Sequence, residues 1–315
     1  MLTIRPYYTE DHTKLLPLLK NFDPAITDTI WQKLLDYKWE NKLGYRGMLL
    51  ENEGSIVGFL SYILYQKEVK SLETTFCNIS TWIVNPEFRS KSLQLLSPLF
   101  KIKNIVILNL SPHENTLSVF NALRFDMLSE YEYLINPYKL KLSFLFIKNK
   151  ASVNYQSLNE QNINKCDIDD KTKQLIKDHS QYKNIQFYRF IISKNGNENT
   201  LILAFNQKEI KPEVTRDKVK ELPYKLLNRI DKLELLYSSS ADFLIQYFIE
   251  VMHSLIFNTK ARSINISEHF TNKTNLNVDY VAKNKKDRSW FFYSENEIEL
   301  AEINLLYTEK VLLNF

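Results

Sequence analysis

The stretch TWIVNPEFRSKSLQLL at residues 81–96 constrains the fold more than any other part of this chain. A short apolar strand, a basic polar loop and a leucine-rich helix follow one another there without a break, and Pro98 is expected to shorten or kink the helix. The unbonded first amides of such a helix and the positive end of its dipole attract an anion, and Arg89 and Lys91 add positive charge. The stretch therefore predicts a loop that binds a phosphorylated ligand.

The same loop also allows a plainer interpretation, because it contains no glycine. None of the five glycines of the chain lies between Phe59 and Asn195, so the loop backbone does not reach left-handed angles freely. Side chains then stand where a diphosphate would lie closest. An ordinary basic helix start is the alternative that stays open.

Length predicts two domains, because 315 residues are twice the ~150 residues of a usual domain. Residues 149–170 are polar and rich in Asn and Gln, which marks them as the boundary. We expect a first domain over residues 1–150 and a second over 165–315.

The composition argues against several other classes of protein. A formal net charge of +4 is too small for a nucleic-acid surface, and we interpret the basic run at 283–288 as a solvated loop before the strand SWFFYS. No apolar stretch reaches the ~20 residues of a membrane span, and the first residues have no signal-peptide core. Cys77 and Cys166 are interpreted as isolated thiols in a reducing compartment, which favours the cytoplasm, and no His or Cys spacing indicates a metal site.

Hydrophobic periodicity predicts an α/β fold in which a mixed, largely antiparallel sheet is flanked by helices. In the first half we expect helices near 15–19, 30–39, 89–99 and 115–123, and strands at 2–7, 47–50, 56–65, 75–84, 105–110, 131–135 and 139–147. In the second half we expect strands at 187–193, 200–205, 229–237 and 261–267 and a helix at 241–257. The order of hairpin, strand, helix and strand returns without residue identity, so the halves form a weak structural repeat.

Four segments, read in order, resemble the GCN5-related N-acetyltransferase (GNAT) superfamily. They are IRPYYTEDH at 4–12, GSIVGFLSY at 54–62, IVNPEFRSKSLQLL at 83–96 and LSPHENTLSVFNALRF at 110–125. The resemblance implies a GNAT-like domain that takes acetyl-CoA or another acyl-CoA as co-substrate, without a metal. It implies that the backbone of Ile83 and Val84 pairs with the pantetheine arm and polarises the thioester carbonyl. It further implies a diphosphate site made of Arg89, Ser90, Lys91, Ser92, Leu93 and Gln94.

The chain departs from the family pattern where the chemistry should lie. Ser92 and Gln94 stand where a Gly and a small residue are expected, and Phe120 replaces the Tyr that often protonates the leaving thiolate. His113 replaces an Asn, and Arg124 replaces the Gly before the terminal Phe. Tandem GNAT-like proteins encoded with surface-polysaccharide enzymes resemble this chain in the RSKSL loop and the double layout, which would make the variant loop a subfamily trait.

The second half resembles the family only in strand order, so we expect a degenerate GNAT-like domain. Its equivalent loop, YSSSAD at 237–242, carries Asp242, which competes for the helix amides and repels phosphate. We expect this domain to bind no CoA, and to form an acceptor cleft with the first domain or to support it.

Two residues are candidates for the base that takes a proton from the acceptor. Glu73 precedes the strand that leads into the loop, although an exposed turn carboxylate is the alternative, and His113 follows an apolar strand, although a helix-capping role is the alternative. Cys77 is interpreted as an ordinary buried thiol. The sequence thus predicts an acyltransferase that acts on a small amine or hydroxyl acceptor, with an amino sugar for surface polysaccharide as the guess from resemblance. A non-catalytic GNAT-like binding protein is the alternative.

Overall fold

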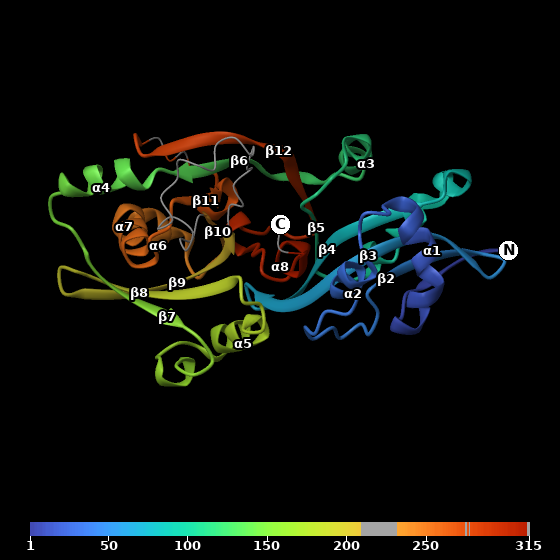
Figure 1. Ribbon diagram of the computed structural model, residues 1–315, viewed down its shortest axis with the longest axis horizontal. Helices are drawn as coiled ribbons and strands as arrows, with labels where there is room; N and C mark the ends of the chain where they lie inside the picture. Colours follow the sequence, from blue (N-terminus) through green and yellow to red (C-terminus); the bar gives the residue numbers. More distant parts are fainter. Residues whose placement is uncertain (209–231, 275, 277, 314–315) are drawn as a thin grey trace, which may run out of the picture. The chain divides into compact units, whose positions relative to one another are not determined.

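The computed structural model describes residues 1–208, 232–274, 276 and 278–313 (Figure 1). The chain forms two compact units, Met1–Glu130 with Asp287–Phe315, and Tyr131–Lys286. This division differs from the expected one at 150 and 165, because the last part of the chain returns to the first unit. Polar composition marks loops, but it does not reveal which unit a later strand joins.

The first unit contains a sheet in the order β1, β2, β3, β4, β5 and β12. The pairs are antiparallel except for β4 with β5, which are parallel, so the predicted mixed, largely antiparallel sheet is confirmed. The strands are β1 (Leu2–Pro6), β2 (Gly47–Asn52), β3 (Ser55–Val69), β4 (Leu72–Val84), β5 (Ile105–Asn109) and β12 (Val281–Ser294).

The strand that completes this sheet comes from the far end of the sequence. Phe291–Ser294 of β12 pairs with β5, where we had expected a strand at 139–147 to close the domain. That prediction is wrong, because residues 137–145 form the helix α4 (Pro137–Leu145). The Asn136 side chain accepts hydrogen bonds from the amides of Tyr138 and Lys139, and Pro137 occupies the first helical turn, so a local capping signal outweighs the alternating pattern KLKLSF.

The middle of the first sheet carries a bulge and then an open edge. Leu60 pairs with Trp82 but Tyr62 pairs with Ile79, so two residues of β4, Ser80 and Thr81, face one residue of β3. On its other side β4 pairs with β5 only from Thr75 to Ile79. Residues 80–84 of β4 therefore extend beyond the end of β5 without a β5 partner.

The two faces of this sheet carry different layers. On one face, Cys77 and Ile79 of β4 share an apolar cluster with Leu95, Leu96 and Leu99 from the segment after β4 and with the α3 region. On the other face, α1 packs against β3 and β4, and α8 packs against α2. The helices are α1 (His12–Phe22), α2 (Asp28–Leu35), α3 (Leu117–Ala122) and α8 (Glu309–Leu313).

The segment after β4 differs from the expected leucine-rich α-helix. It forms two 3₁₀ helices, η2 (Pro86–Leu95) and η3 (Leu99–Lys101), with turns between them. In a 3₁₀ helix each amide bonds to the carbonyl three residues earlier, as the amides of Phe88 and Leu96 do with Asn85 and Leu93. The amides of η2 thus serve largely its own turns, and the segment lacks the free first turn of an α-helix.

The end of α3 explains the pattern before Phe125. The amide of Phe125 bonds to the carbonyl of Phe120 and the amide of Arg124 to that of Asn121, which is the Schellman arrangement of a helix C-terminus. The ring centroids of Phe120 and Phe125 lie 4.9 Å apart. Arg124 has φ = 60°, a left-handed angle that favours glycine.

The second unit contains a sheet in the order β6, β11, β10, β9, β8 and β7. Asn195 and Gly196, with φ of 51° and 81°, form the predicted tight turn of the β8–β9 hairpin.

The first three residues of the expected strand 229–237 lie outside the described residues, and the basic run 283–288, expected as a loop, lies within β12. The remaining elements are β6 (Asp126–Ile135), β7 (Ser152–Leu158), β8 (Ile185–Lys194), β9 (Asn197–Lys208), β10 (Lys232–Ser238), β11 (Ser263–Ser267), α5 (Asp170–His179), α6 (Ala241–Gln246) and α7 (Phe248–Thr259). Among the described residues, no helix has the length and apolar character needed to cross a bilayer.

Candidate functional site

The open edge of β4 is the first component of a candidate site. The Asn85 amide donates to the Val57 carbonyl on the β3 side at 2.8 Å, and Ile83 is the partner of Phe59. Because successive residues of a strand direct their N–H and C=O groups to opposite edges, those of Val84 and Trp82 point away from β3, toward the open edge. Of the two residues predicted to contact a pantetheine arm through the backbone, Val84 thus faces the opening and Ile83 faces β3.

The basic segment η2 is the second component, and it directly follows this edge. Arg89, Ser90 and Lys91 are exposed, as are Leu93 and Gln94, while the side chain of Ser92 is half-buried. The segment is anchored from beneath, because the hydroxyl of Tyr62 in β3 donates to the carbonyl of Leu95 at 2.7 Å. The structure therefore places the predicted diphosphate residues together, with two exposed cations at the end of β4.

The two predicted bases lie apart from this edge. Glu73 is near the start of β4, about 35 Å along the strand from Val84 at ~3.3 Å per residue, and its exposed carboxylate pairs with Lys42. His113 is exposed, and its Nδ1 accepts the amide of Asn115 at 3.3 Å at the start of a 3₁₀ turn. Both positions match the alternatives that the sequence left open, an exposed carboxylate and a capping histidine.

Two other residues singled out from the sequence belong to the core. Cys77 is fully buried, and burial raises the pKa of its thiol well above the usual value. Phe120 is also fully buried, with its ring against Phe125, Phe291 and Trp82. The position that carries a Tyr in many GNAT enzymes thus supplies packing and no hydroxyl.

A carboxyl group that the sequence analysis missed lies on the opposite face of β4. Asn78 stands between Cys77 and Ile79, so its side chain points to the other face of the sheet. Its Oδ1 accepts the backbone amide of Glu309 at 3.1 Å, and the hydroxyl of Ser111, just after β5, donates to Glu309 Oε1 at 3.2 Å. Figure 1 shows α8 beside β4 and β5.

Glu309 is buried to an unusual degree for a glutamate. Only 1% of the residue is exposed, and its Oε2 has no hydrogen-bond partner. Burial is the main cause that raises the pKa of its carboxyl to about 7, against smaller lowering effects from its own backbone amide, Lys310 and Ser111. A single acidic residue inside the apolar run INLLYTEKVLL was the available sequence signal, because a glutamate there must be either buried or at a break in the core.

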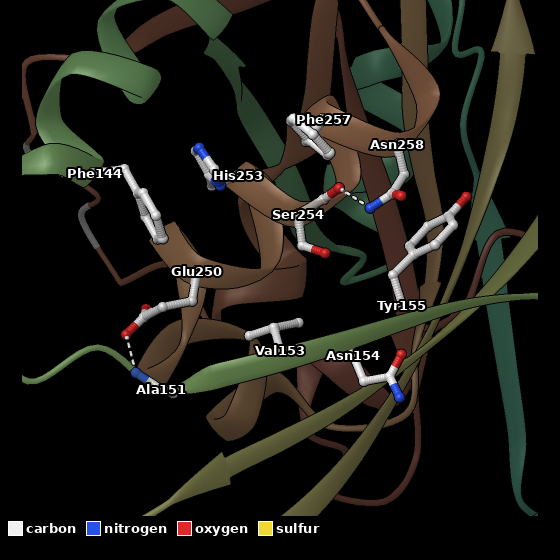
Figure 2. A pocket seen from close by; sticks show the side chains of 10 residues that line it. All are labelled: Phe144, Ala151, Val153, Asn154, Tyr155, Glu250, His253, Ser254, Phe257 and Asn258. Carbon is white, nitrogen blue, oxygen red and sulfur yellow. Dashed lines mark hydrogen bonds between the residues drawn. The ribbon is translucent and has the colours of Figure 1, made fainter.

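The second unit contains a separate hollow between α4, β7 and α7 (Figure 2). It has a volume of about 430 Å³. The rings of Phe144 and His253 stack at 3.7 Å between centroids, and Lys150 Nζ lies 4.2 Å from the Phe144 ring centre. Burial, followed by the charges of Lys141 and Lys150, lowers the pKa of His253, so the ring is held largely neutral at pH 7.

The second unit's own loop is occupied by local hydrogen bonds. Ser240 Oγ accepts the amide of Phe243 at 3.2 Å, and Ser239 Oγ accepts the amide of Ile202 at 2.9 Å. The helix that follows, α6, has six residues and carries Asp242 in its first turn. The Ser240 side chain thus takes one of the helix amides that a phosphate would need.

Comparisons with solved structures agree with the fold. No protein-family model and no curated protein matches the sequence. The fold matches a GCN5-related N-acetyltransferase from Anabaena variabilis with a TM-score of 0.53 at 11% identity, over 94% of this chain and 73% of that one. It matches a probable N-acyltransferase from Enterococcus faecalis with a TM-score of 0.55 at 10% identity, over 93% and 72%. A GCN5-related N-acetyltransferase from Kribbella flavida gives 0.54 at 9% identity, over 96% and 73%.

These matches span both halves of the chain. Among the described residues, no group of three or more His, Cys, Asp or Glu side chains is placed to hold a metal ion. The chain has the fold of the GCN5-related N-acetyltransferases.

Proposed function

We propose that this protein is an acyltransferase that uses acetyl-CoA or another acyl-CoA and moves the acyl group to a small amine or hydroxyl acceptor. The observation that carries the proposal is the end of β4, where residues 80–84 have no β5 partner and lead directly into the exposed cations of η2. An extended amide-bearing arm can pair with the outward N–H and C=O groups of Trp82 and Val84, as an added strand would.

The charged part of the co-substrate would lie at η2. Arg89 and Lys91 are exposed there and supply positive charge, while Ser90 and Ser92 supply hydroxyl donors. Side-chain contacts carry more of the binding in this arrangement than in a glycine loop, because the 3₁₀ turns engage much of the backbone. We therefore expect Arg89 and Lys91 to contribute more to the affinity for acyl-CoA than exposed cations usually do.

Calorimetric titration with acetyl-CoA tests the proposal. We expect binding that weakens about tenfold or more in the double variant Arg89→Ala, Lys91→Ala, because two charge-assisted contacts to the diphosphate are lost. Lys103→Ala is the matched control, since this exposed lysine precedes Ile105 at the opposite end of the β4–β5 ladder. Absence of heat with acetyl-CoA and longer acyl-CoAs would overturn the proposal.

The acceptor follows from the resemblance and is the finer part of the proposal. An amino sugar destined for a surface polysaccharide is the acceptor we expect, and release of CoA over a panel of nucleotide-linked amino sugars tests it. His113→Ala and Glu73→Ala belong in the same assay, because both residues were predicted as bases. A loss of rate in either variant would show that the replaced residue takes part in the reaction.

A non-catalytic acyl-CoA-binding protein is the second candidate, and the burial of Phe120 favours it. A fully buried phenyl ring cannot protonate a departing thiolate, so the chain must either do without this acid or lack turnover. Binding of acetyl-CoA without CoA release over the acceptor panel would support this candidate.

A further inference from the structure

We propose that Glu309 is the general base of acyl transfer, acting on the acceptor from the face of β4 opposite to η2; this inference rests on the proposed function. The residue was not predicted from the sequence, and the structure assigns it through its position, its hydrogen bonds and its one unpartnered oxygen.

The position of Glu309 fits the far end of a bound acyl-CoA. Asn78, which holds the Glu309 amide, precedes Ile79, the last β4 residue paired with β5. From Val84 to Ile79 the strand runs about 16 Å at ~3.3 Å per residue. An arm that starts at η2 and follows the open edge toward the bulge thus brings its acyl end toward the carboxyl of Glu309.

The two faces of β4 separate the two reactants. The Leu95 end of η2 packs on the face that carries Cys77 and Ile79, whereas Glu309 packs on the face that carries Asn78. An acceptor that enters from the α8 face would meet the thioester from the side away from the candidate diphosphate site. The carboxyl then stands on the acceptor's side of the scissile bond.

The carboxyl is held so that one oxygen is left for a ligand. Ser111 donates to Oε1, and the backbone of Glu309 is fixed by Asn78, while the buried Oε2 has no partner. Buried polar atoms without partners are rare, and they mark places where a ligand or a water completes the hydrogen bonding. Two further buried atoms of this kind lie on elements that meet here, the hydroxyl of Tyr65 and the Nε1 of Trp31.

These elements are in contact with the segment that carries Glu309. The ring of Tyr65 stacks on Tyr307 at 4.4 Å between centroids, and α2, which bears Trp31, packs against α8. Lys67 fixes the same segment by bonding to the carboxylate of Glu302 at 2.6 Å. The carboxyl is thus presented by a segment anchored at several points.

The charged surroundings of Glu309 suit a base that works near neutral pH. Lys310 on α8 is the charged neighbour that acts on the carboxyl, while β4 and the end of β5 contribute the neutral groups of Asn78 and Ser111. On α2, the Oδ2 atom of Asp28 lies 3.4 Å from the Nζ atom of Lys20, and the side chain of Lys33 is exposed. Burial raises the pKa of Glu309 to about 7, so much of the group is ionised at neutral pH and still basic enough to accept a proton.

The reaction then balances with this chain's groups. The acceptor nitrogen or oxygen attacks the thioester carbonyl carbon, and its proton passes to Oε2 of Glu309. The carbon–sulfur bond breaks as the tetrahedral intermediate collapses, and the proton passes from Glu309 to the departing CoA thiolate. The products are the acylated acceptor and CoA, and the carboxylate is restored.

The test measures CoA release from acetyl-CoA with small primary amines, amino sugars included, between pH 5 and 9, together with acetyl-CoA affinity by calorimetry. We expect Glu309→Gln to lower kcat/KM at pH 8 by 100-fold or more, to leave the affinity within threefold, and to remove the rise in rate around pH 7. Glu299→Gln, an exposed glutamate upstream of α8, is the matched control and should behave as wild type.

A second variant separates a base from a structural carboxyl. The hydrogen bond from Ser111 lowers the pKa of Glu309, so Ser111→Ala should move the rise in rate to higher pH without abolishing it. A rate within threefold of wild type in Glu309→Gln, or an unmoved profile in Ser111→Ala, overturns the assignment. Lack of acetyl-CoA binding by the wild type overturns the proposed function itself, and binding without CoA release overturns the base while acyl-CoA binding stands.

Discussion

The side chain of Asn78 accepts the backbone amide of Glu309 at 3.1 Å, which joins the middle of β4 to α8 across 231 residues of sequence. Asn78 is fully buried, and the residues on either side of it in β4, Cys77 and Ile79, are apolar. A buried amide of this kind holds the later segment in register with the end of the β4–β5 ladder. The contact positions a carboxyl group that neither segment could place alone.

Removal of the Asn78 side-chain amide should destabilise the first unit. Asn78→Ala leaves the Glu309 amide buried without an acceptor, so we expect a loss of about 1–3 kcal/mol in the free energy of unfolding. Urea denaturation measures it, with Ser97→Ala as the control because Ser97 is exposed and its hydroxyl donates to the nearby Gln94 carbonyl. A change below about 0.5 kcal/mol would show that the contact is unimportant for stability.

Glu309 should make stability depend on pH in a defined direction. Its folded-state pKa of about 7 lies above the ordinary value of 4.5, so the folded protein binds the extra proton. The stabilisation is complete below pH 4.5 and is lost as the pH rises through about 7, by about 3 kcal/mol in total. Denaturation at pH 5 and pH 8.5 should show most of this difference in wild type and in Glu299→Gln, and a much smaller one in Glu309→Gln.

Arg124→Gly should stabilise the protein. Arg124 has φ = 60° at the end of α3, and a left-handed angle costs an L-residue about 1–2 kcal/mol. Glycine removes this cost, but it also makes the unfolded chain more flexible, which offsets part of the gain in stability. We expect a net gain of about 0.5–1 kcal/mol in thermal or urea unfolding. Arg124→Ala keeps the Cβ and should gain nothing, and an equal gain in both variants would contradict the strain argument.

Salt should weaken acyl-CoA binding through η2. Arg89 and Lys91 are exposed, so their attraction for a diphosphate is screened as ionic strength rises. Between about 50 and 500 mM salt we expect the wild-type affinity to fall several-fold, and that of Arg89→Ala, Lys91→Ala to fall much less. Equal salt dependence in both proteins would place the diphosphate elsewhere.

Lys150→Gln should raise the pKa of His253. The positive charge of Lys150, together with burial and Lys141, disfavours the charged imidazole. The titration of the ring carbon proton by NMR measures the pKa, which should rise but stay below its ordinary value because burial is the larger cause. Lys165→Gln is the control, because Lys165 lies in the same unit but does not act on the pKa of His253.

Local signals in the sequence determined much of the first unit. The apolar runs at 56–65 and 75–84 and the Gly-containing link between 50 and 55 predicted the hairpin strands, and Asn195-Gly196 predicted a tight turn in the second unit, because strand alternation and left-handed turn angles depend on neighbouring residues. Clustering of the predicted diphosphate residues also follows from their sequence adjacency.

Only the tertiary structure decided the partners of these elements. Residues 291–294 pair with β5, the β4–β5 ladder ends at Ile79, and Glu309 reaches Asn78, and none of these contacts follows from neighbouring residues in the sequence. Hydrophobic pattern reports whether a residue is buried but not against which segment, so no local reading finds them. For the same reason the sequence marks Glu309 only as an acid within an apolar run, and the fold alone supplies Asn78 and Ser111 as its partners.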